Sequence, residues 1–225
     1  MRIIFSFLLL SIPLVSLATT ASNPIAEVVK MRGEVTQLSP GAMIARVVVL
    51  GDKFVEDTSI VTGPKSFIKV KFIDKTELNV GPESKIVISE MKQDSIGIIS
   101  LLKGRIRTEV EKDSSKPDVN KFFIKTRTAA MGVRGTDFQT IYNPENKMTS
   151  LLTYKGEVAM AKVDDNTFDS LEKPTKLIKR DDISKAPSIT EVPSEKMDEA
   201  QGLNKILSSK TTVLVPPGQN SFSSD

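Results

Sequence analysis

Apolar and polar residues alternate with a period of two along much of this chain, which is typical of β-strands with one buried and one solvent-exposed face. Ile68, Val70 and Phe72 fall on one side of such a strand, and Lys69 and Lys71 fall on the other. Turn signals rich in glycine and proline separate the apolar segments. We therefore expect an all-β domain of short antiparallel strands in a solenoid-like or sandwich-like stack. The predicted strands are 45–50, 68–72, 86–88, 105–110, 122–126, 138–142 and 151–160, of which 45–50 and 86–88 look the more buried.

A short pattern recurs three times. A basic residue, a glycine, a charged residue and a β-branched residue follow one another at 32–35, 103–106 and 155–158. Similar turns that enter similar strands indicate stacked β units. The spacings between the three copies are uneven, so the recurrence is compatible with a solenoid but does not prove one.

The character of the chain changes near residue 164. Residues 163–193 are polar and contain prolines, which is typical of a linker or a long excursion from a domain. Within 194–225 we expect one short helix over 194–208, a strand over 211–215 and a disordered end. The β domain itself is assigned to residues 22–162.

The N-terminus has the pattern of a secretory signal peptide over residues 1–21. Arg2 gives the positive end, residues 3–17 are apolar, and small residues suited to cleavage lie at 16–18 or 19–21. The alternative is a membrane anchor, but the apolar stretch is shorter than the ~20 residues of a spanning helix and Pro13 interrupts it. We therefore expect a periplasmic or secreted protein with no membrane span once the leader is removed.

The composition excludes several kinds of chemistry. The sequence contains no cysteine, histidine or tryptophan, which excludes disulfides, thiolate metal sites and histidine general bases. The carboxylate pairs, Glu109 with Glu111 and Asp164 with Asp165, lie in polar contexts that do not raise a pKa for acid catalysis. We expect no catalytic residue, no cofactor and no metal site. The formal net charge of +3 is close to balanced and does not favour nucleic acid as a partner.

The run 126–138 carries a signature with two glycines around a lone arginine: Gly132, Arg134, Gly135 and Thr136. Glycine inside a strand usually marks a bulge, a bend or a close backbone approach. Arg134 has two interpretations. It either meets an anionic ligand from a glycine-flexed loop, or it points inward and binds carbonyl groups or a carboxylate such as Asp137. We favour the structural role for all four residues.

A second set of candidates is basic. Lys69, Lys71, Arg105 and Arg107, together with Lys103, form a basic strip if their strands are neighbours. Such a strip suits an acidic protein partner or an anionic envelope polymer. The alternative is an ordinary charged sheet face that discourages edge pairing.

The order of these motifs resembles the FecR-like domains of bacterial envelope proteins. The matching pieces are Gly33-Glu-Val35, Gly51-Asp52, Thr62-Gly63, Pro82-Glu-Ser84, Lys103-Gly104, Val133-Arg-Gly-Thr136 and Lys155-Gly-Glu-Val158. The resemblance implies a β fold and an envelope location. Two departures stand out. Lys75 replaces the glycine usual in the hairpin after Asp74, so another turn type is expected there. The anti-sigma segment and membrane span of full-length family sensors are not expected ahead of this domain.

These observations predict a non-catalytic, exported binding module with a protein-interaction or signalling-accessory role and an unknown envelope partner. The alternative is a module that binds envelope polysaccharide or peptidoglycan, although the low aromatic content of 5% argues against a sugar site. A carboxylate-based hydrolase is the third and least favoured interpretation.

Overall fold

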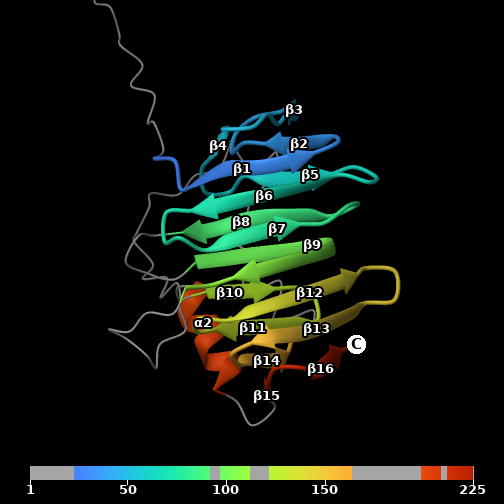
Figure 1. Cartoon of the computed structure of the whole chain (residues 1–225). Helices are drawn as coiled ribbons and strands as arrows, with labels where there is room; N and C mark the ends of the chain where they lie inside the picture. Colours follow the sequence, from blue (N-terminus) through green and yellow to red (C-terminus); the bar gives the residue numbers. More distant parts are fainter. Residues whose placement is uncertain (1–22, 92–96, 112–121, 164–198, 209–211, 225) are drawn as a thin grey trace, which may run out of the picture.

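The protein is described by a computed structural model over residues 23–91, 97–111, 122–163, 199–208 and 212–224 (Figure 1). Strands dominate these residues, and one short helix follows them, as the alternation predicts. The elements are β1 (Ala26–Arg32), β2 (Val35–Leu38), β3 (Arg46–Val47), β4 (Lys53–Phe54), β5 (Ser59–Thr62), β6 (Phe67–Phe72), β7 (Glu77–Val80), β8 (Lys85–Met91), β9 (Gly97–Glu109), β10 (Phe122–Lys125), β11 (Ala129–Val133), β12 (Asp137–Asn143), β13 (Met148–Lys155), β14 (Val158–Lys162), α2 (Glu199–Leu207), β15 (Val213–Val215) and β16 (Asn220–Ser223).

The strands form two sheets that share one long strand. Sheet A has the order β4-β1-β6-β7-β9-β12-β13-β16, and sheet B has the order β3-β2-β5-β8-β9-β10-β11-β14-β15. The first half of β9 pairs with β8 and β10 in sheet B, and its second half pairs with β7 and β12 in sheet A. Strand β9 therefore ties the two layers together.

Strand order in each sheet nearly follows the sequence, so the molecule is a stack of rungs from its N-terminal end to its C-terminal end (Figure 1). The predicted all-β stack is confirmed, and it combines sandwich-like layers with solenoid-like order. Strand β10 departs from the antiparallel pattern, because it runs parallel to β9. The chain leaves β9 in sheet A and returns to sheet B in the same direction, which a tight hairpin cannot do.

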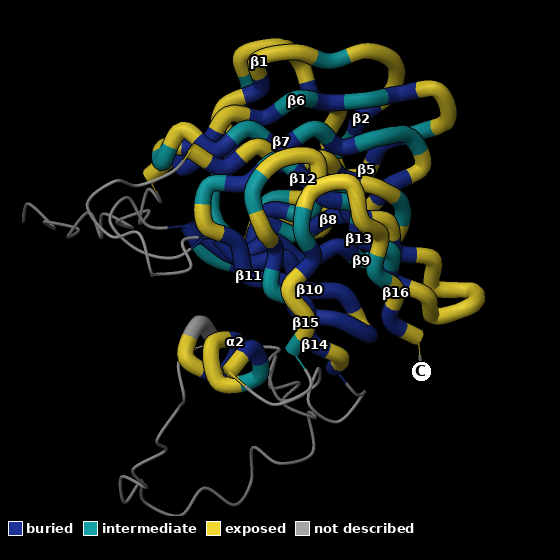
Figure 2. The backbone as a smooth tube through the Cα atoms, turned by 60° about the horizontal axis from the view of Figure 1, so that its bottom comes forward, coloured by how far each residue is buried: buried dark blue, intermediate teal, exposed yellow. Residues whose placement is uncertain are grey.

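The inner faces of both sheets pack on one core. Ile68, Val70 and Ile106 of sheet A are buried together with Ile86 and Ile99 of sheet B. Figure 2 shows the buried positions in the interior of the stack and exposed positions along its turns. The predicted alternation at 68–72 and 105–110 is thus confirmed, because the apolar side chains point inward and the charged ones outward.

The outer face of sheet B carries a second, smaller core under helix α2. Ile98 and Phe123 on the sheet pack with Leu203 and Leu207 of the helix. Small residues on the neighbouring strands, Ala130 among them, leave room for the helix backbone to approach.

No helix of the described residues is long and apolar enough to cross a membrane.

The recurring basic-glycine pattern marks the corners where the chain passes between the sheets. Gly33, Gly104 and Gly156 all have positive φ, between 79° and 92°, and each lies between a sheet A segment and a sheet B segment. A side chain at Gly104 is also excluded by space, because an added Cβ would lie 2.6 Å from the Cα of Ser84. Glycine is therefore required by backbone conformation and by close approach together.

A serine on the neighbouring rung completes two of these corners. The Ser66 hydroxyl accepts a hydrogen bond from the Glu34 amide at 2.9 Å, and the Ser84 hydroxyl accepts one from the Arg105 amide at 3.0 Å. Each hydroxyl donates to a proline carbonyl two residues before it, Pro64 or Pro82. The corners are thus cross-linked from rung to rung.

Three sequence expectations are corrected here. Segment 45–50 has only the two-residue strand β3. It is mostly exposed because it lies on the terminal rung at the N-terminal end of the stack, with no described strand beyond it. The expected disordered end contains β16, which pairs with β13. Gly132 has no positive φ and pairs regularly with Phe123 and Ala159, so it is not a bulge. The expected helix is confirmed over 199–207, while its predicted start at 194–198 and the expected linker lie outside the described residues.

Candidate binding groove on the outer face of sheet A

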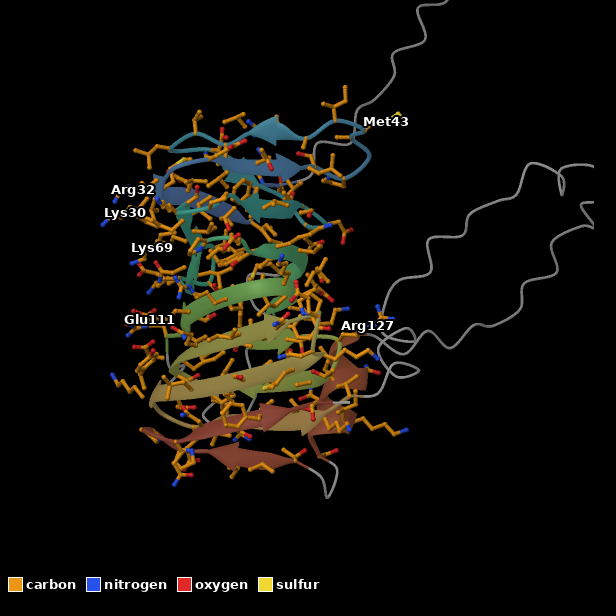
Figure 3. The ribbon with its side chains drawn as sticks, turned by 90° about the vertical axis from the view of Figure 1, so that its right-hand side faces the viewer. Lys30, Arg32, Met43, Lys69, Glu111 and Arg127 are labelled. Atoms are coloured by element: carbon orange, nitrogen blue, oxygen red, sulfur yellow. The ribbon has the colours of Figure 1, made fainter. Side chains whose placement is uncertain are left out.

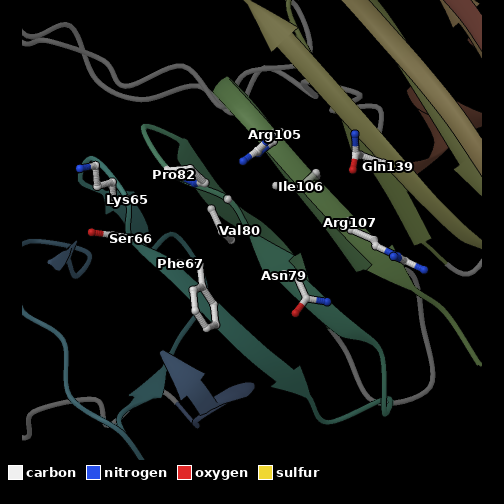
Figure 4. Close-up of a pocket in the computed structure, with 11 residues that line it drawn as sticks. Lys65, Ser66, Phe67, Asn79, Val80, Pro82, Arg105, Ile106, Arg107 and Gln139 are labelled. Carbon is white, nitrogen blue, oxygen red and sulfur yellow. The ribbon is translucent and has the colours of Figure 1, made fainter. Parts of the chain in front are cut away.

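A groove of about 360 Å³ lies on the outer face of sheet A, across β6, β7, β9 and β12 (Figure 4). Gly81, Phe67 and Arg105 are among the residues that line this groove. The Arg105 side chain lies over this glycine, where an added Cβ would be 2.6 Å from its Cγ and 2.7 Å from its Nε. Since Gly81 does not have positive φ, the reason for a glycine here is space and not backbone strain.

Three cations line the groove, and two of them are Arg105 on β9 and Lys65 in the corner before β6. Both are exposed, and no ion pair within the described residues is assigned to either. Their charges are therefore available to an anionic group on a partner.

Polar amides and one aromatic ring provide the rest of the lining. Asn79 on β7 and Gln139 on β12 lie on either side of Arg107, in register with it across the sheet. Phe67 offers an apolar surface at the other end (Figure 4). Amides donate and accept hydrogen bonds in equal measure, so this row suits peptide groups or hydroxyls.

Arg107 is held in place by its neighbours. Its Nε and Nη2 donate to the Asp137 carboxylate at 2.9 and 2.7 Å, and its guanidinium carbon lies 4.3 Å from the centre of the Tyr154 ring. The side-chain hydrogen bond with Asp137 raises the pKa of Arg107 above its ordinary value. The Arg107 side chain therefore lines the groove in a fixed position, and the Asp137 carboxylate largely balances its positive charge.

The predicted basic strip is divided by strand β7, which carries one acidic residue, Glu77. Lys69, Lys71, Arg105 and Arg107 share the outer face of sheet A, but β7 lies between β6 and β9. Lys69, in register with Asn79, forms an ion pair with Glu77 of β7, and Lys71 is in register with Glu77. The fifth member, Lys103, instead lies in register with Lys85 in sheet B. Figure 3 shows Lys30, Arg32 and Lys69 on one side of the molecule and Arg127 on the opposite side.

The signature residues occupy a corner and not the groove. Gly135 has φ of 68°, which confirms the expected bend, and Thr136 is buried with its carbonyl accepting from the Val110 amide at 2.9 Å. The expectation of an inward Arg134 is wrong, because its side chain is exposed. The carboxylate suggested for it, Asp137, accepts two hydrogen bonds from Arg107.

Sequence reasoning missed Lys65, Phe67, Asn79 and Gln139. A usable signal was present in the two Gly-Pro-x-Ser segments, 63–66 and 81–84, which place matching corners on successive rungs. The second of these corners supplies Gly81 and Pro82 to the lining of the groove. The described residues contain no cluster of three or more carboxylates that could hold a metal ion, and the groove combines cations, amides and one aromatic ring without a paired acid and base.

Comparison with known proteins identifies a family. The family model described as "FecR protein" matches residues 58–186, which is more than half of the chain.

Two crystal structures of a candidate anti-sigma factor from Parabacteroides distasonis align with TM-scores of 0.45 and 0.44 and identities of 13% and 12%. The alignments cover 73% of this chain and 53% of that protein, so the chain spans about half the length of this structural neighbour. A third structure, a cell surface anchoring domain, aligns over 29% of this chain and 86% of its own length, with 29% identity and a TM-score of 0.28. No curated protein matches the sequence.

Proposed function

Because this chain belongs to the FecR protein family, we propose that it is a non-catalytic binding module of the cell envelope with a signalling-accessory role. The groove on the outer face of sheet A binds an extended segment of a protein partner that carries at least one carboxylate. The observation that carries this proposal is the pair of available cations that line the groove, Lys65 and Arg105, the second of which lies over Gly81.

The lining supports a peptide ligand. Asn79 and Gln139 match the alternating donors and acceptors of an extended backbone, and Phe67 offers a contact for an apolar side chain. Arg105 supplies a planar fork of donors for a carboxylate. A volume of about 360 Å³ accommodates a short stretch of such a segment.

Export is the second part of the proposal. Residues 1–21 have the charge, apolar core and small residues of a signal peptide, and the family resemblance implies an envelope location. N-terminal sequencing of protein from a periplasmic fraction tests this point. A chain that begins near Thr19 or Ser22 supports export, whereas an intact Met1 in the cytoplasmic fraction contradicts it.

The groove is tested by crosslinking in intact cells. A photoreactive residue at Asn79 is expected to capture a protein partner, and the same residue at Lys85, in sheet B, serves as the control. The paired changes Lys65→Glu and Arg105→Glu should abolish capture because they reverse both available charges, while Lys85→Glu should leave it intact. Capture that survives the reversal of both charges would refute the groove as the binding site.

A steric variant separates the groove from its charges. Gly81→Ala places a Cβ where the Arg105 side chain lies, and the backbone at this position tolerates alanine. We expect weakened capture with an unchanged circular dichroism spectrum. Cosedimentation with purified peptidoglycan, lost in the charge-reversal variant, would instead establish the polysaccharide alternative.

A further inference from the structure

The N-terminal end of the stack is closed by a single segment that crosses both sheets. Val48 donates to the Val35 carbonyl of β2 at 2.9 Å, and Gly51 donates to the Val28 carbonyl of β1 at 3.0 Å. Strand β3 pairs only with β2 and β4 pairs only with β1 among the described strands. Residues 46–54 are therefore the terminal rung, with an outer edge that no described strand covers.

Large apolar side chains gather on and beside this rung. Met43, in the loop that leads into β3, is 99% exposed (Figure 3), and the next residue, Ile44, is 84% exposed. We name the set the N-terminal patch, and its members are Leu38, Met43, Ile44, Val47, Val49 and Leu50. Apolar patches of this kind on soluble proteins usually mark an interaction site.

Local hydrogen bonds fix the patch in its outward position. The Asp52 carboxylate accepts from the Val49 amide at 2.9 Å and from the Arg46 guanidinium at 3.1 Å, and the Ala42 amide donates to the Ser39 carbonyl at 3.1 Å. The exposed side chains thus belong to an ordered surface that is available for docking.

The charge around the patch limits the kinds of partner. Between residues 35 and 51 the sequence has one charged residue, Arg46, and Arg46 is paired with Asp52. A nearly neutral apolar surface has no preference for an acidic or a basic partner. The same apolar surface on a second copy of this chain matches it. In a two-fold arrangement, Arg46 of each copy can also face Asp52 of the other copy.

We propose that the N-terminal patch binds a second copy of this chain, end to end, about a two-fold axis normal to the sheets. This axis places β3 beside β3 of the partner copy and β4 beside β4, each pair antiparallel, so that both sheets continue from one copy into the next. Six large apolar side chains at roughly 100 Å² each give about 600 Å² of apolar surface per copy, close to the ~800 Å² per partner of a standard interface.

The arrangement also relates the dimer to ligand binding. A two-fold axis normal to the sheets keeps sheet A on the same side in both copies, so the two grooves open in the same direction. The dimer itself does not depend on the proposed function of the groove, and its failure would leave that function unaffected.

The test is the mass of the full-length purified chain, measured by analytical ultracentrifugation over a wide range of concentration. The wild-type chain is expected to reach twice the monomer mass. Val47→Asp with Leu50→Asp should yield a folded monomer, because both side chains are already exposed in the single chain. The matched control at the opposite end, Val213→Asp with Phe222→Asp, changes equally exposed residues and should remain dimeric. A wild-type chain that stays monomeric throughout, or a dimer that only the control changes disrupt, overturns the proposal.

The absence of cysteine from the sequence allows a second measurement. Val47→Cys should form a disulfide-linked dimer under mild oxidation, because the two-fold axis brings β3 of the two copies together. Phe222→Cys, at the other end of the stack, should remain unlinked. The reverse result would place the interface at the C-terminal end and reject the N-terminal patch.

Discussion

At the scale of single residues, Lys75 shows how a local departure from the family pattern is accommodated. The Lys75 amide donates to the Phe72 carbonyl at 3.0 Å, the Phe72 amide donates to the Thr76 carbonyl at 2.9 Å, and Lys75 has φ of 69°. This geometry is a four-residue turn over 72–75 whose last residue is left-handed, and the Asp74 carboxylate stabilises it by accepting from the Thr76 amide and hydroxyl. The expected change of turn type is therefore confirmed.

Lys75→Gly is expected to raise the free energy of unfolding by about 1 kcal/mol, because glycine adopts positive φ without the strain of a side chain. The exposed ion pair with Glu111, at 3.4 Å, contributes little to set against this gain. Urea unfolding measures the difference. Lys71→Gly, in the neighbouring strand and without positive φ, should be destabilising by contrast, and a loss of stability in both variants would contradict the argument.

The signature around Arg134 shows what a single sequence can and cannot reveal about a residue. The bend at Gly135 was predictable, because a glycine just before a polar corner commonly supplies the positive φ that the bend requires. The exposure of Arg134 and the regular pairing of Gly132 were not, because the pairing requires both the preceding strand β10 and the later strand β14 as neighbours of β11. The same limit applies to the ion pair between Arg107 and Asp137, which are 30 residues apart.

We expect Gly135→Val to lower the free energy of unfolding by about 1–3 kcal/mol, because valine is strained at φ of 68°. Arg134→Ala should lower it by no more than about 1 kcal/mol, because water screens the interactions of an exposed guanidinium. Thermal and urea unfolding of the two variants side by side measure this contrast. Equal losses in both would restore a structural role for the arginine.

At the scale of elements, the serine corners explain how successive rungs keep their register. The Ser84 hydroxyl joins the amide of Arg105 to the carbonyl of Pro82, and it stands directly against Gly104. One hydroxyl thus fixes the position of β8 relative to β9 at the point where β9 changes sheet.

Ser84→Ala should lower the free energy of unfolding by about 1–3 kcal/mol, because it leaves a partly buried amide and carbonyl without this partner. Ser150→Ala on the outer face of β13 is the control and is expected to be nearly neutral. If urea unfolding gives equal midpoints for the two variants, the corner hydroxyl has no role in stability.

The elements also show where reasoning from a short segment fails. Alternation correctly predicted β6 and β12, whose apolar side chains face the core, whereas β10 is buried on both faces and does not alternate. The β-branched content of 45–50 predicted a buried strand, yet on the terminal rung no described strand covers its outer edge. Burial of a β-branched run depends on its place in the stack, which the run itself does not encode.

At the scale of the whole molecule, we propose that the C-terminal segment belongs to the β domain and is not an appendage. Strand β15 extends sheet B, β16 extends sheet A, and α2 covers Ile98 and Phe123. The sequence suggested a helix and a strand in this region but could not place them against strands far earlier in the chain.

Truncation after Lys162 is therefore expected to lower the thermal midpoint markedly and to expose apolar surface that binds a hydrophobic dye. Leu203→Asp in the full chain should produce part of this loss by detaching α2, because Leu203 is fully buried. Asn204→Asp, on the exposed side of the helix, is the control. A truncated chain that unfolds at the wild-type temperature would show that the segment is dispensable.

The order of rungs has a mechanical consequence. The first rungs lie at one end of the stack and β16 lies at the other, while the strands run across the line between them (Figure 1). A pull on the two ends would load the ladder hydrogen bonds in sequence, because each rung contacts mainly its neighbours. The rungs should then separate one after another at low force. This sequence should stop at β9, because β9 is paired in both sheets and both sets of hydrogen bonds must break together.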